Sequence, residues 1–293
     1  MKEWILALDL GTTNWKAALF GRGGELLQLG SMPAPEIDRG GCQVYDPFQL
    51  PGHLERLLSL LDDEKKSRVC AVGLTGMAES GGLVSRKDHR PLTEIRPWFD
   101  RRSLPVFDAW RDRPAFQGRQ AVTGLPDSFK YGIFKLLSFR ESGAELRDAC
   151  LLGVVEQAFL ALTDSIGEDA TLAARTGAYD VRRRCWDEGF LQALNLPLEL
   201  LPPVRPLGKT PEKRFGLPGG IPVLIGGHDH VCAAFGAGAL TEGRVMLSMG
   251  TAQVMLTGPR LCKSVEKVAL VGSKPFFSFP SLSPNNCFNH SDN

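Results

Sequence analysis

Residues 9–13 combine an acid, a glycine and two hydroxyl groups at the end of an apolar run. A carboxylate is costly to bury unless it meets a cation or hydrogen-bond donors, so Asp9 indicates a site. Gly11 permits close backbone approach, and the hydroxyl and amide groups of Thr12 and Thr13 can surround phosphate oxygens. The alternative is an ordinary hairpin turn capped by Asp9, because turns use the same residue types.

A second segment, residues 226–230, reads Gly-Gly-His-Asp-His. A strand, two glycines and an acid at the start of a helix would place Asp229 in a cleft, where it could act as a general base. A helix cap is the rival role for Asp229, and polar lining is the simpler role for His228 and His230. Zinc binding by this histidine pair needs further ligands, and no partner cluster is evident in the sequence.

A third segment, Gly250 and Thr251 followed by Ala252, repeats the Gly-Thr turn of residues 11–12 inside a predicted hairpin. Residues 208–210 resemble the end of a phosphate-binding P-loop, but Pro203 stands where that motif needs glycine. No G-x-G-x-x-G follows a strand, so a nicotinamide site is unsupported.

The elements that would position these residues begin with three strands, at 4–9, 15–20 and 25–29, separated by tight turns. Such a meander does not start a dinucleotide-binding fold. The run 4–9 is apolar enough for a strand buried on both faces. A helix is expected after Asp46-Pro47, with leucines at i, i+3, i+4 and i+7. We also expect strands at 69–74, 83–86 and 223–225, mainly helical structure over 107–161 (strongest at 151–162) and a helix at 186–194. A small-residue helix should follow residues 226–230 and run to 238, and a hairpin of 244–249 and 253–256 and a loose tail should complete the chain.

Composition narrows the class of protein. The 293 residues carry a net charge of +1 and are 43% hydrophobic, which argues against disorder and against a nucleic-acid or anionic-membrane partner. No run of about 18 apolar residues and no signal segment is visible. The seven cysteines are scattered and form no C-x-x-C pair, so we expect reduced thiols in a cytoplasmic protein.

Three further segments follow the same order along the chain: residues 75–80 (Thr-Gly-Met-Ala-Glu-Ser), 97–102 (Pro-Trp-Phe-Asp-Arg-Arg) and 169–176, with Trp186 downstream. Together with residues 9–13, 226–229 and 250–252, they resemble the motifs of the FGGY family of carbohydrate kinases, in the actin/hexokinase-like ATPase superfamily. The resemblance runs from about residue 3 to residue 258. It implies an α/β fold: a ribonuclease H-like (actin-like ATPase) sugar-binding domain over 1–241, with a mixed sheet flanked by helices. Residues 242–293 would be the stub of a second, nucleotide-binding domain, with a disordered tail.

The resemblance also implies a reaction, the transfer of a phosphoryl group from ATP to a hydroxyl of a sugar or polyol. Asp229 would be the general base, and Asp9 and Asp229 would hold Mg²⁺. Phosphate groups would contact Gly11, Thr12, Thr13, Gly250 and Thr251, and the substrate would contact Glu79, Trp98, Asp100 and Asp229. Core packing is the alternative for Trp98, and a salt bridge to Arg101 or Arg102 is the alternative for Asp100.

The chain departs from the family pattern in two respects. Glu79 stands where many pentulose kinases carry histidine, and Ala78 replaces both their methionine and the arginine of the glycerol-kinase version. Family members also place most nucleotide contacts on the second domain, and no glycine-rich adenosine segment follows Gly258. We therefore expect a truncated chain with impaired kinase activity. A non-catalytic sugar-binding or regulatory fragment is the alternative, and a homodimer is the assembly considered.

Overall fold

The computed structural model describes residues 4–241, 244–249, 253–257 and 276–277. Three antiparallel strands open the chain: β1 (Trp4–Leu10), β2 (Asn14–Phe20) and β3 (Leu26–Pro33). The predicted meander is confirmed, with β3 longer than the sequence pattern indicated. The turn between β1 and β2 holds Gly11, Thr12 and Thr13.

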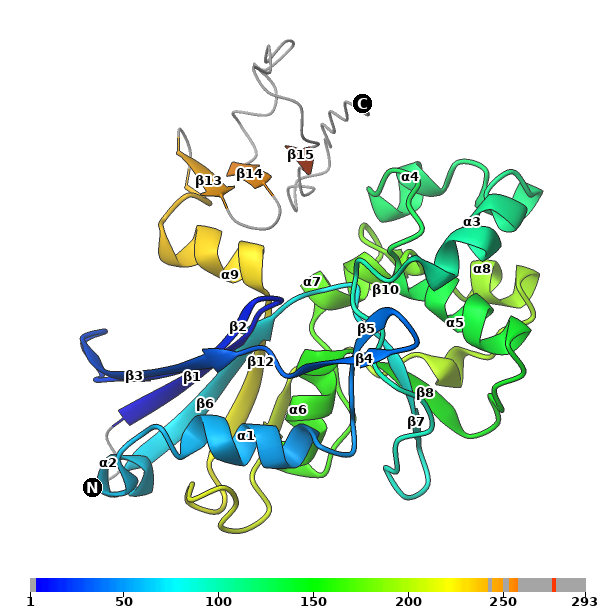
Figure 1. Ribbon diagram of the computed structural model, residues 1–293. Coiled ribbons are helices and arrows are strands. Elements are labelled where there is room, and N and C mark those ends of the chain that lie inside the picture. The colour runs from blue at the N-terminus through cyan, green and yellow to red at the C-terminus, as the bar shows by residue number, and fades with distance from the viewer. Residues whose placement is uncertain (1–3, 242–243, 250–252, 258–275, 278–293) are drawn as a thin grey trace.

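Three later strands complete a six-stranded sheet in the order β11-β12-β6-β1-β2-β3. They are β6 (Val69–Gly76), β11 (Leu207–Lys209) and β12 (Pro222–His228). Strand β6 runs parallel to both of its neighbours, β1 and β12, whereas the outer pairs are antiparallel. The sheet is therefore mixed, and three parallel strands at its centre end at the same edge (Figure 1).

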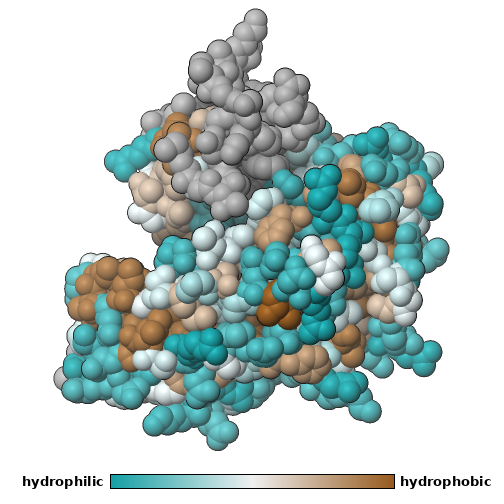
Figure 2. Space-filling view, viewed as in Figure 1, coloured by the Kyte–Doolittle hydropathy of each residue, from teal (hydrophilic) through white to brown (hydrophobic). Residues whose placement is uncertain are grey.

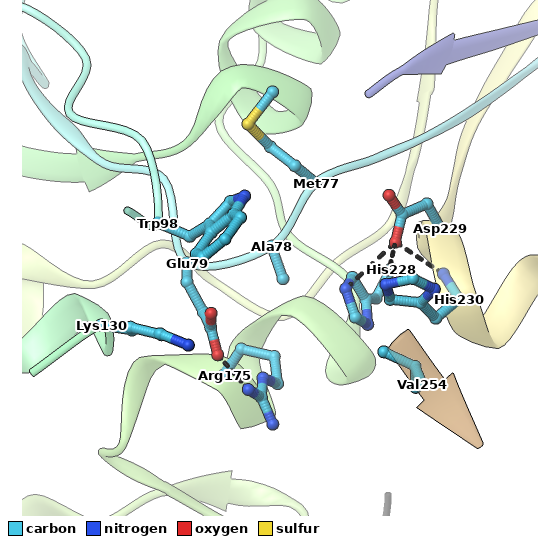
Figure 3. Close-up of a pocket in the computed structure, with 10 residues that line it drawn as sticks. All are labelled: Met77, Ala78, Glu79, Trp98, Lys130, Arg175, His228, Asp229, His230 and Val254. Atoms are coloured by element: carbon cyan, nitrogen blue, oxygen red, sulfur yellow. Dashed lines mark hydrogen bonds and ion pairs between the residues drawn. The ribbon is translucent and has the colours of Figure 1, made fainter. Parts of the chain in front are cut away.

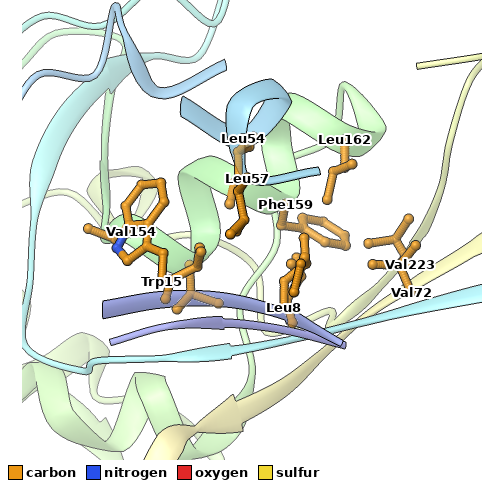
Figure 4. Close-up of a cluster of buried hydrophobic side chains, with 14 of the residues drawn as sticks. Leu8, Trp15, Leu54, Leu57, Val72, Val154, Phe159, Leu162 and Val223 are labelled. Atoms are coloured by element: carbon orange, nitrogen blue, oxygen red, sulfur yellow. The ribbon is translucent and has the colours of Figure 1, made fainter. Parts of the chain in front are cut away.

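Helices α1 (Leu50–Leu58) and α6 (Val154–Thr163) cover one face of this sheet (Figures 1 and 4). Alternate residues of β1 point into the core that they form, so Leu6, Leu8 and Leu10 are fully buried. Ile5, on the opposite face, is 40% exposed. The prediction that this strand is buried on both faces is therefore wrong, because the two helices pack on one side only.

Two helix boundaries differ from the sequence prediction. The carboxylate of Asp46 accepts a hydrogen bond from the Phe48 amide (3.0 Å) in a preceding turn, and helix α1 starts later, with Gln49 as its N-cap. Leu151 and Leu152, expected in a helix, end strand β8 (Ala149–Leu152), which pairs with β7 (Gly82–Ser85). A short apolar run fits a buried strand as well as a buried helix, and Gly153 separates the two elements.

A second, mainly helical region lies beside the sheet (Figure 1). Its core includes a group of aromatic rings, with Phe116 stacked on Phe134 and edge-on to Phe190, at centroid separations of 5.2 Å. The predicted helix at 186–194 is confirmed over a shorter span, and Trp186 belongs to a strand instead. The elements of this region are α3 (Leu104–Trp110), α4 (Arg119–Thr123), α5 (Gly132–Glu141), α7 (Ala170–Ala173), α8 (Glu188–Ala193), β9 (Tyr179–Asp180), β10 (Cys185–Trp186) and the 3₁₀ turns η1 (Arg101–Ser103), η2 (Pro114–Phe116), η3 (Ala174–Thr176) and η4 (Leu198–Leu200).

The last described elements follow strand β12. Helix α9 (Asp229–Gly236) leads to the predicted hairpin, β13 (Val245–Met249) with β14 (Gln253–Thr257), and β15 (Phe276–Phe277) pairs with β14. Ala234 of α9 packs with Val254 and Leu256 of the hairpin. The remaining elements are β4 (Glu36–Arg39), β5 (Cys42–Tyr45) and α2 (Asp63–Ser67). Within the described ranges, no helix is long and apolar enough to cross a membrane.

Candidate active site

The ends of three parallel strands bring the predicted chemical residues together. Asp9 of β1 lies opposite Thr75 of β6, and Thr75 lies opposite Gly227 of β12. The Thr75 hydroxyl donates a hydrogen bond to the Gly227 carbonyl (2.8 Å). Ligands of open α/β sheets bind outside the carboxyl ends of such strands, which makes this edge the candidate site.

Two glycines allow the strands to approach this closely. A Cβ atom at Gly76 would lie 2.6 Å from the Leu10 carbonyl oxygen. At Gly227 the backbone has φ of 123°, and a Cβ atom would lie 2.4 Å from the Thr171 hydroxyl. The sequence pattern placed this glycine after the strand, between the strand and the following helix. It lies instead within β12, where the register shifts between Ile225 and Gly227.

Asp229 is the first residue of α9, at the mouth of this edge. Its Oδ1 accepts a hydrogen bond from the His230 amide (2.6 Å) and lies 3.1 Å from Nε2 of His228. Burial raises the pKa of Asp229 to about 7, and the negative charges of Asp9 and Glu79 add to this effect. A carboxyl group with a pKa near neutrality is suited to accept a proton at physiological pH.

The backbone that carries Asp229 is held by residues 169–171. The His228 amide donates to the Thr171 hydroxyl (2.8 Å), which itself donates to the carboxylate of Asp169 (2.6 Å). This contact gives the 169–176 segment a physical role that its sequence did not disclose, because it fixes the point at which strand β12 becomes helix α9.

Asp9 offers a second carboxylate near Asp229. Its Oδ2 lies 3.3 Å from the ammonium group of Lys16, while Oδ1 is buried and accepts no hydrogen bond from any described residue. A buried carboxylate oxygen without a donor is energetically unfavourable unless a cation or water satisfies it. Two nearby carboxylates, one with such an oxygen, form the type of donor set that a hard divalent cation prefers.

A pocket opens beside these carboxylates (Figure 3). On its far wall, the carboxylate of Glu79 forms an ion pair with Arg175, and Glu79 itself has a left-handed backbone with φ of 63°. Such a conformation in a residue other than glycine is often found at functional sites. The lining residues are Met77, Ala78, Glu79, Trp98, Lys130, Arg175, His228, Asp229, His230 and Val254.

Trp98 connects the pocket to the turn after β1. Its indole Nε1 donates a hydrogen bond to the Thr12 hydroxyl (3.0 Å), and the ammonium group of Lys130 lies 5.0 Å from the centre of its ring. The ring is partly buried against the sheet core, so both the packing and the pocket interpretations of Trp98 describe part of its surroundings. Gly11 and Thr13 lie in the same turn, outside the pocket lining.

Asp100 is not among the pocket residues. Its carboxylate accepts hydrogen bonds from the amide (2.8 Å) and Nε (2.9 Å) of Arg102. Burial favours the neutral acid, but these hydrogen bonds and the charge of Arg102 outweigh it and hold the pKa of Asp100 below its usual value. The structure therefore has the salt bridge that the sequence offered as the alternative, and substrate contact by Asp100 stays a prediction.

The sequence motifs did not identify two of the pocket residues, and two predicted site residues lie outside the described ranges. Lys130 was not singled out, because a lone lysine before a helix carries no motif. Arg175 was noticed only as part of the 169–176 segment, although a buried arginine usually has a carboxylate partner. Gly250 and Thr251, the second predicted phosphate turn, fall outside the described residues.

The mixed sheet flanked by helices is the actin-like ATPase fold that is found in solved sugar kinases. Xylulose kinase from Lactobacillus acidophilus superimposes with a TM-score of 0.74 at 23% identity, over 85% of this chain and 53% of that one. Plasmodium falciparum glycerol kinase with ADP gives a TM-score of 0.75 at 19% identity, with the same coverage of both chains.

Comparison of sequences identifies the family. Residues 4–236 match the model of the N-terminal domain of the FGGY family of carbohydrate kinases, and the chain belongs to this family. A glycerol kinase from Halorhodospira halophila is 27% identical over 274 residues, which are 87% of this chain and 53% of that protein. The chain spans about half the length of the curated relatives it matches.

Proposed function

We propose that this chain carries the acceptor site and the general base of an ATP-dependent carbohydrate kinase, which phosphorylates a hydroxyl group of a sugar or polyol. The observation that supports this most is Asp229, a carboxyl group with a pKa raised to about 7 at the edge of a pocket and close to Asp9. Membership of the FGGY family supports the same reaction class.

Asp229 would accept the proton of the attacking hydroxyl. Its pKa lies close to physiological pH, so the group is substantially ionised when the substrate arrives and gains a proton readily. The hydrogen bond from the His230 amide orients the carboxylate, since that amide belongs to the first turn of α9. A proton transfer of this type typically accelerates a reaction by about 10²–10⁴-fold.

Asp9 and Asp229 would hold Mg²⁺, and the unpartnered Oδ1 of Asp9 fits that role. When bound, the ion would neutralise charge on the phosphoryl group in transfer. Thr12 and Thr13, together with Gly11, would hold phosphate oxygens in the turn after β1, with Gly250 and Thr251 as the second such turn. The hydrogen bond from Trp98 fixes the Thr12 hydroxyl relative to the pocket.

Glu79 and Trp98 would bind the acceptor. A carboxylate accepts hydrogen bonds from sugar hydroxyls, and an indole face packs against their C–H groups. Arg175 holds Glu79 in place from inside the pocket. Residues 1–241 would form this sugar-binding domain, and the hairpin of β13 and β14 would begin a second domain within 242–293.

A homodimer is the assembly we propose, because β3 is an edge strand of the sheet. Leu26 and Leu29 on it are each 55% exposed, and Figure 2 shows hydrophobic surface at this end of the molecule. Exposed apolar edge strands are templates for pairing with another chain. Light scattering would give the mass in solution, and a monomer at all concentrations would exclude this assembly.

The reaction is tested by incubating the 293-residue chain at high concentration with ATP, Mg²⁺ and, separately, glycerol, D-xylulose or D-gluconate. Mass spectrometry then measures phosphorylated product, with Asp229→Asn as the matched control. We expect slow formation of one product, absent in the control. If none of the acceptors binds in calorimetric titration and none is phosphorylated, the proposed substrate class is wrong.

A second function is acceptor binding without phosphoryl transfer. The observation that favours it is that Glu79, Trp98 and Asp229, the residues proposed to contact the acceptor, line one pocket within the matched residues 4–236. Calorimetry separates the two functions. Binding of an acceptor without binding of ATP favours a sugar-binding or regulatory role, whereas tight binding of Mg·ATP favours the kinase.

A further inference from the structure

Three consecutive residues at the start of α9 bring three metal-ligand atoms to one point. Nε2 of His228 lies 3.1 Å from Oδ1 of Asp229, and Nε2 of His230 lies 3.9 Å from the same oxygen. The ligand atoms of the three residues all lie within 4.8 Å of one another. Figure 3 shows both imidazole rings beside this carboxylate, at the edge of the pocket.

The local backbone explains this convergence. His228 is extended, with φ of −61° and ψ of 135°, and Asp229 begins the helix. The change from strand to helix turns the two histidine side chains toward each other, with ring centroids 5.1 Å apart and planes at 83°. The His230 amide fixes the carboxylate of Asp229 between them (2.6 Å).

A histidine–aspartate hydrogen bond accounts for only part of this arrangement. The separation of 3.1 Å between His228 and Asp229 is a hydrogen-bond distance, but 3.9 Å between His230 and Asp229 is too long for one. The second imidazole nitrogen nevertheless lies close to the same oxygen. A metal ion bound between the three side chains would account for both histidines.

Two of the three separations between ligand atoms lie near those of a tetrahedral metal site. Zinc bonds of about 2.0–2.1 Å at tetrahedral angles place neighbouring ligand atoms about 3.3–3.4 Å apart. The observed 3.1 and 3.9 Å lie on either side of that value. All three ligand atoms lie within 4.8 Å of one another, so a bound ion would draw the two imidazole rings closer together by side-chain rotation. Two imidazole nitrogens and one carboxylate oxygen form a donor set that suits Zn²⁺, whereas Mg²⁺ prefers oxygen ligands alone.

We propose that His228, Asp229 and His230 form a binding site for Zn²⁺ or a similar divalent transition metal, with the fourth coordination position open to the acceptor pocket. The sequence pattern left the histidine pair without a third ligand, and the structure supplies it in the residue between them. Metal binding itself is independent of the kinase proposal. The effect of the metal on activity rests on the kinase proposal. A bound metal occupies the Asp229 carboxylate, which can then no longer accept a proton. The metal would therefore inhibit phosphoryl transfer.

The test uses Co²⁺ as a spectroscopic probe on the full chain, followed by calorimetric titration with Zn²⁺. We expect the visible absorption of four-coordinate Co²⁺, without the charge-transfer band that cysteine ligands would give. His228→Gln and His230→Gln should each weaken metal binding at least about tenfold. His89→Asn is the matched control, because His89 lies in a turn with φ of 60°, which asparagine tolerates.

Three results would overturn the proposal: no cobalt spectrum in the unchanged chain, a thiolate band, or equal affinity in the two histidine variants and the control. Circular dichroism confirms that each variant is folded, and His230→Gln leaves the His228 backbone contact to Thr171 in place. Acceptor titration of the metal-free chain separates the two proposals. Acceptor binding without metal binding removes this inference alone, and metal binding without any acceptor removes the proposed function alone.

Discussion

Asp229 and Asp100 show how two similar residues reach opposite electrostatic states. Each lies at the start of a short helical element, and the sequence motifs predict a functional role for both. Burial raises the pKa in both cases, but Arg102 binds Asp100 and reverses the shift, whereas Asp229 receives a backbone amide and lies near two further acids. The Asp100 side chain is 1% exposed and that of Asp229 is 29% exposed. A neighbouring cation, more than burial, separates a structural carboxylate from one available for chemistry.

The largest expected effect follows from Asp229→Asn. We expect phosphoryl transfer to fall about 10²–10⁴-fold, because the amide cannot accept the proton. Stability at pH 8 should not fall, since the native environment of Asp229 disfavours its charge. Product formation and denaturant unfolding measure the two quantities. Retained transfer would show that another group is the base.

Glu156 of α6 is a buried acid that lies away from Asp9 and Asp229, and it extends the comparison to a site without a proposed catalytic role. Burial raises its pKa from 4.5 to about 7, and its neighbour Glu168 is raised for the same reason. A raised native pKa makes the protein lose stability as pH increases from about 4.5 through 7, because the native state binds the proton more tightly than the unfolded chain.

Glu156→Gln should therefore leave stability unchanged near pH 4 and increase it at pH 8 by about 3 kcal/mol, from a shift of this size. Denaturant unfolding at both pH values provides the measurement. Glu55→Gln, at an exposed position of α1, is the matched control and should change neither value. If the free energy of unfolding depends on pH in the same way in the Glu156 variant and in the unchanged chain, the pKa of Glu156 is not raised in the native state.

Asp100→Asn tests the other side of the comparison. The change weakens a charged hydrogen-bond pair with Arg102, and we expect the protein to lose about 1–3 kcal/mol of stability. Acceptor affinity should change little, because Asp100 does not line the pocket. Calorimetric titration beside denaturant unfolding separates the two effects. Loss of acceptor binding in a fully stable variant would restore the predicted substrate contact.

Sequence reasoning predicted the part of the molecule that depends on local pattern. The meander, strand β6 and the positions of Asp9 and Asp229 follow from apolar runs that end in small or acidic residues. It did not predict side-chain contacts between residues that are distant in the sequence. The pairing of Glu79 with Arg175 and the presence of Lys130 in the pocket depend on how the helical region packs beside the sheet. The helix predicted to begin at Leu151 was wrong there for a related reason. An apolar run alone does not distinguish a buried strand from a buried helix, and here the pairing with strand β7 decides it.

The smallest expected effect concerns the hydrogen bond between Trp98 and Thr12, which connects the acceptor pocket with the first phosphate turn. Trp98→Phe keeps an aromatic face and removes the donor, so acceptor affinity should fall about two- to tenfold, as expected for one hydrogen bond. Thr12→Val removes the acceptor atom from the opposite side. If the bond positions the indole ring, the double variant should bind no more weakly than either single variant, because both changes break the same contact. Additive losses in the titration would instead mean that Trp98 and Thr12 act on the ligand separately.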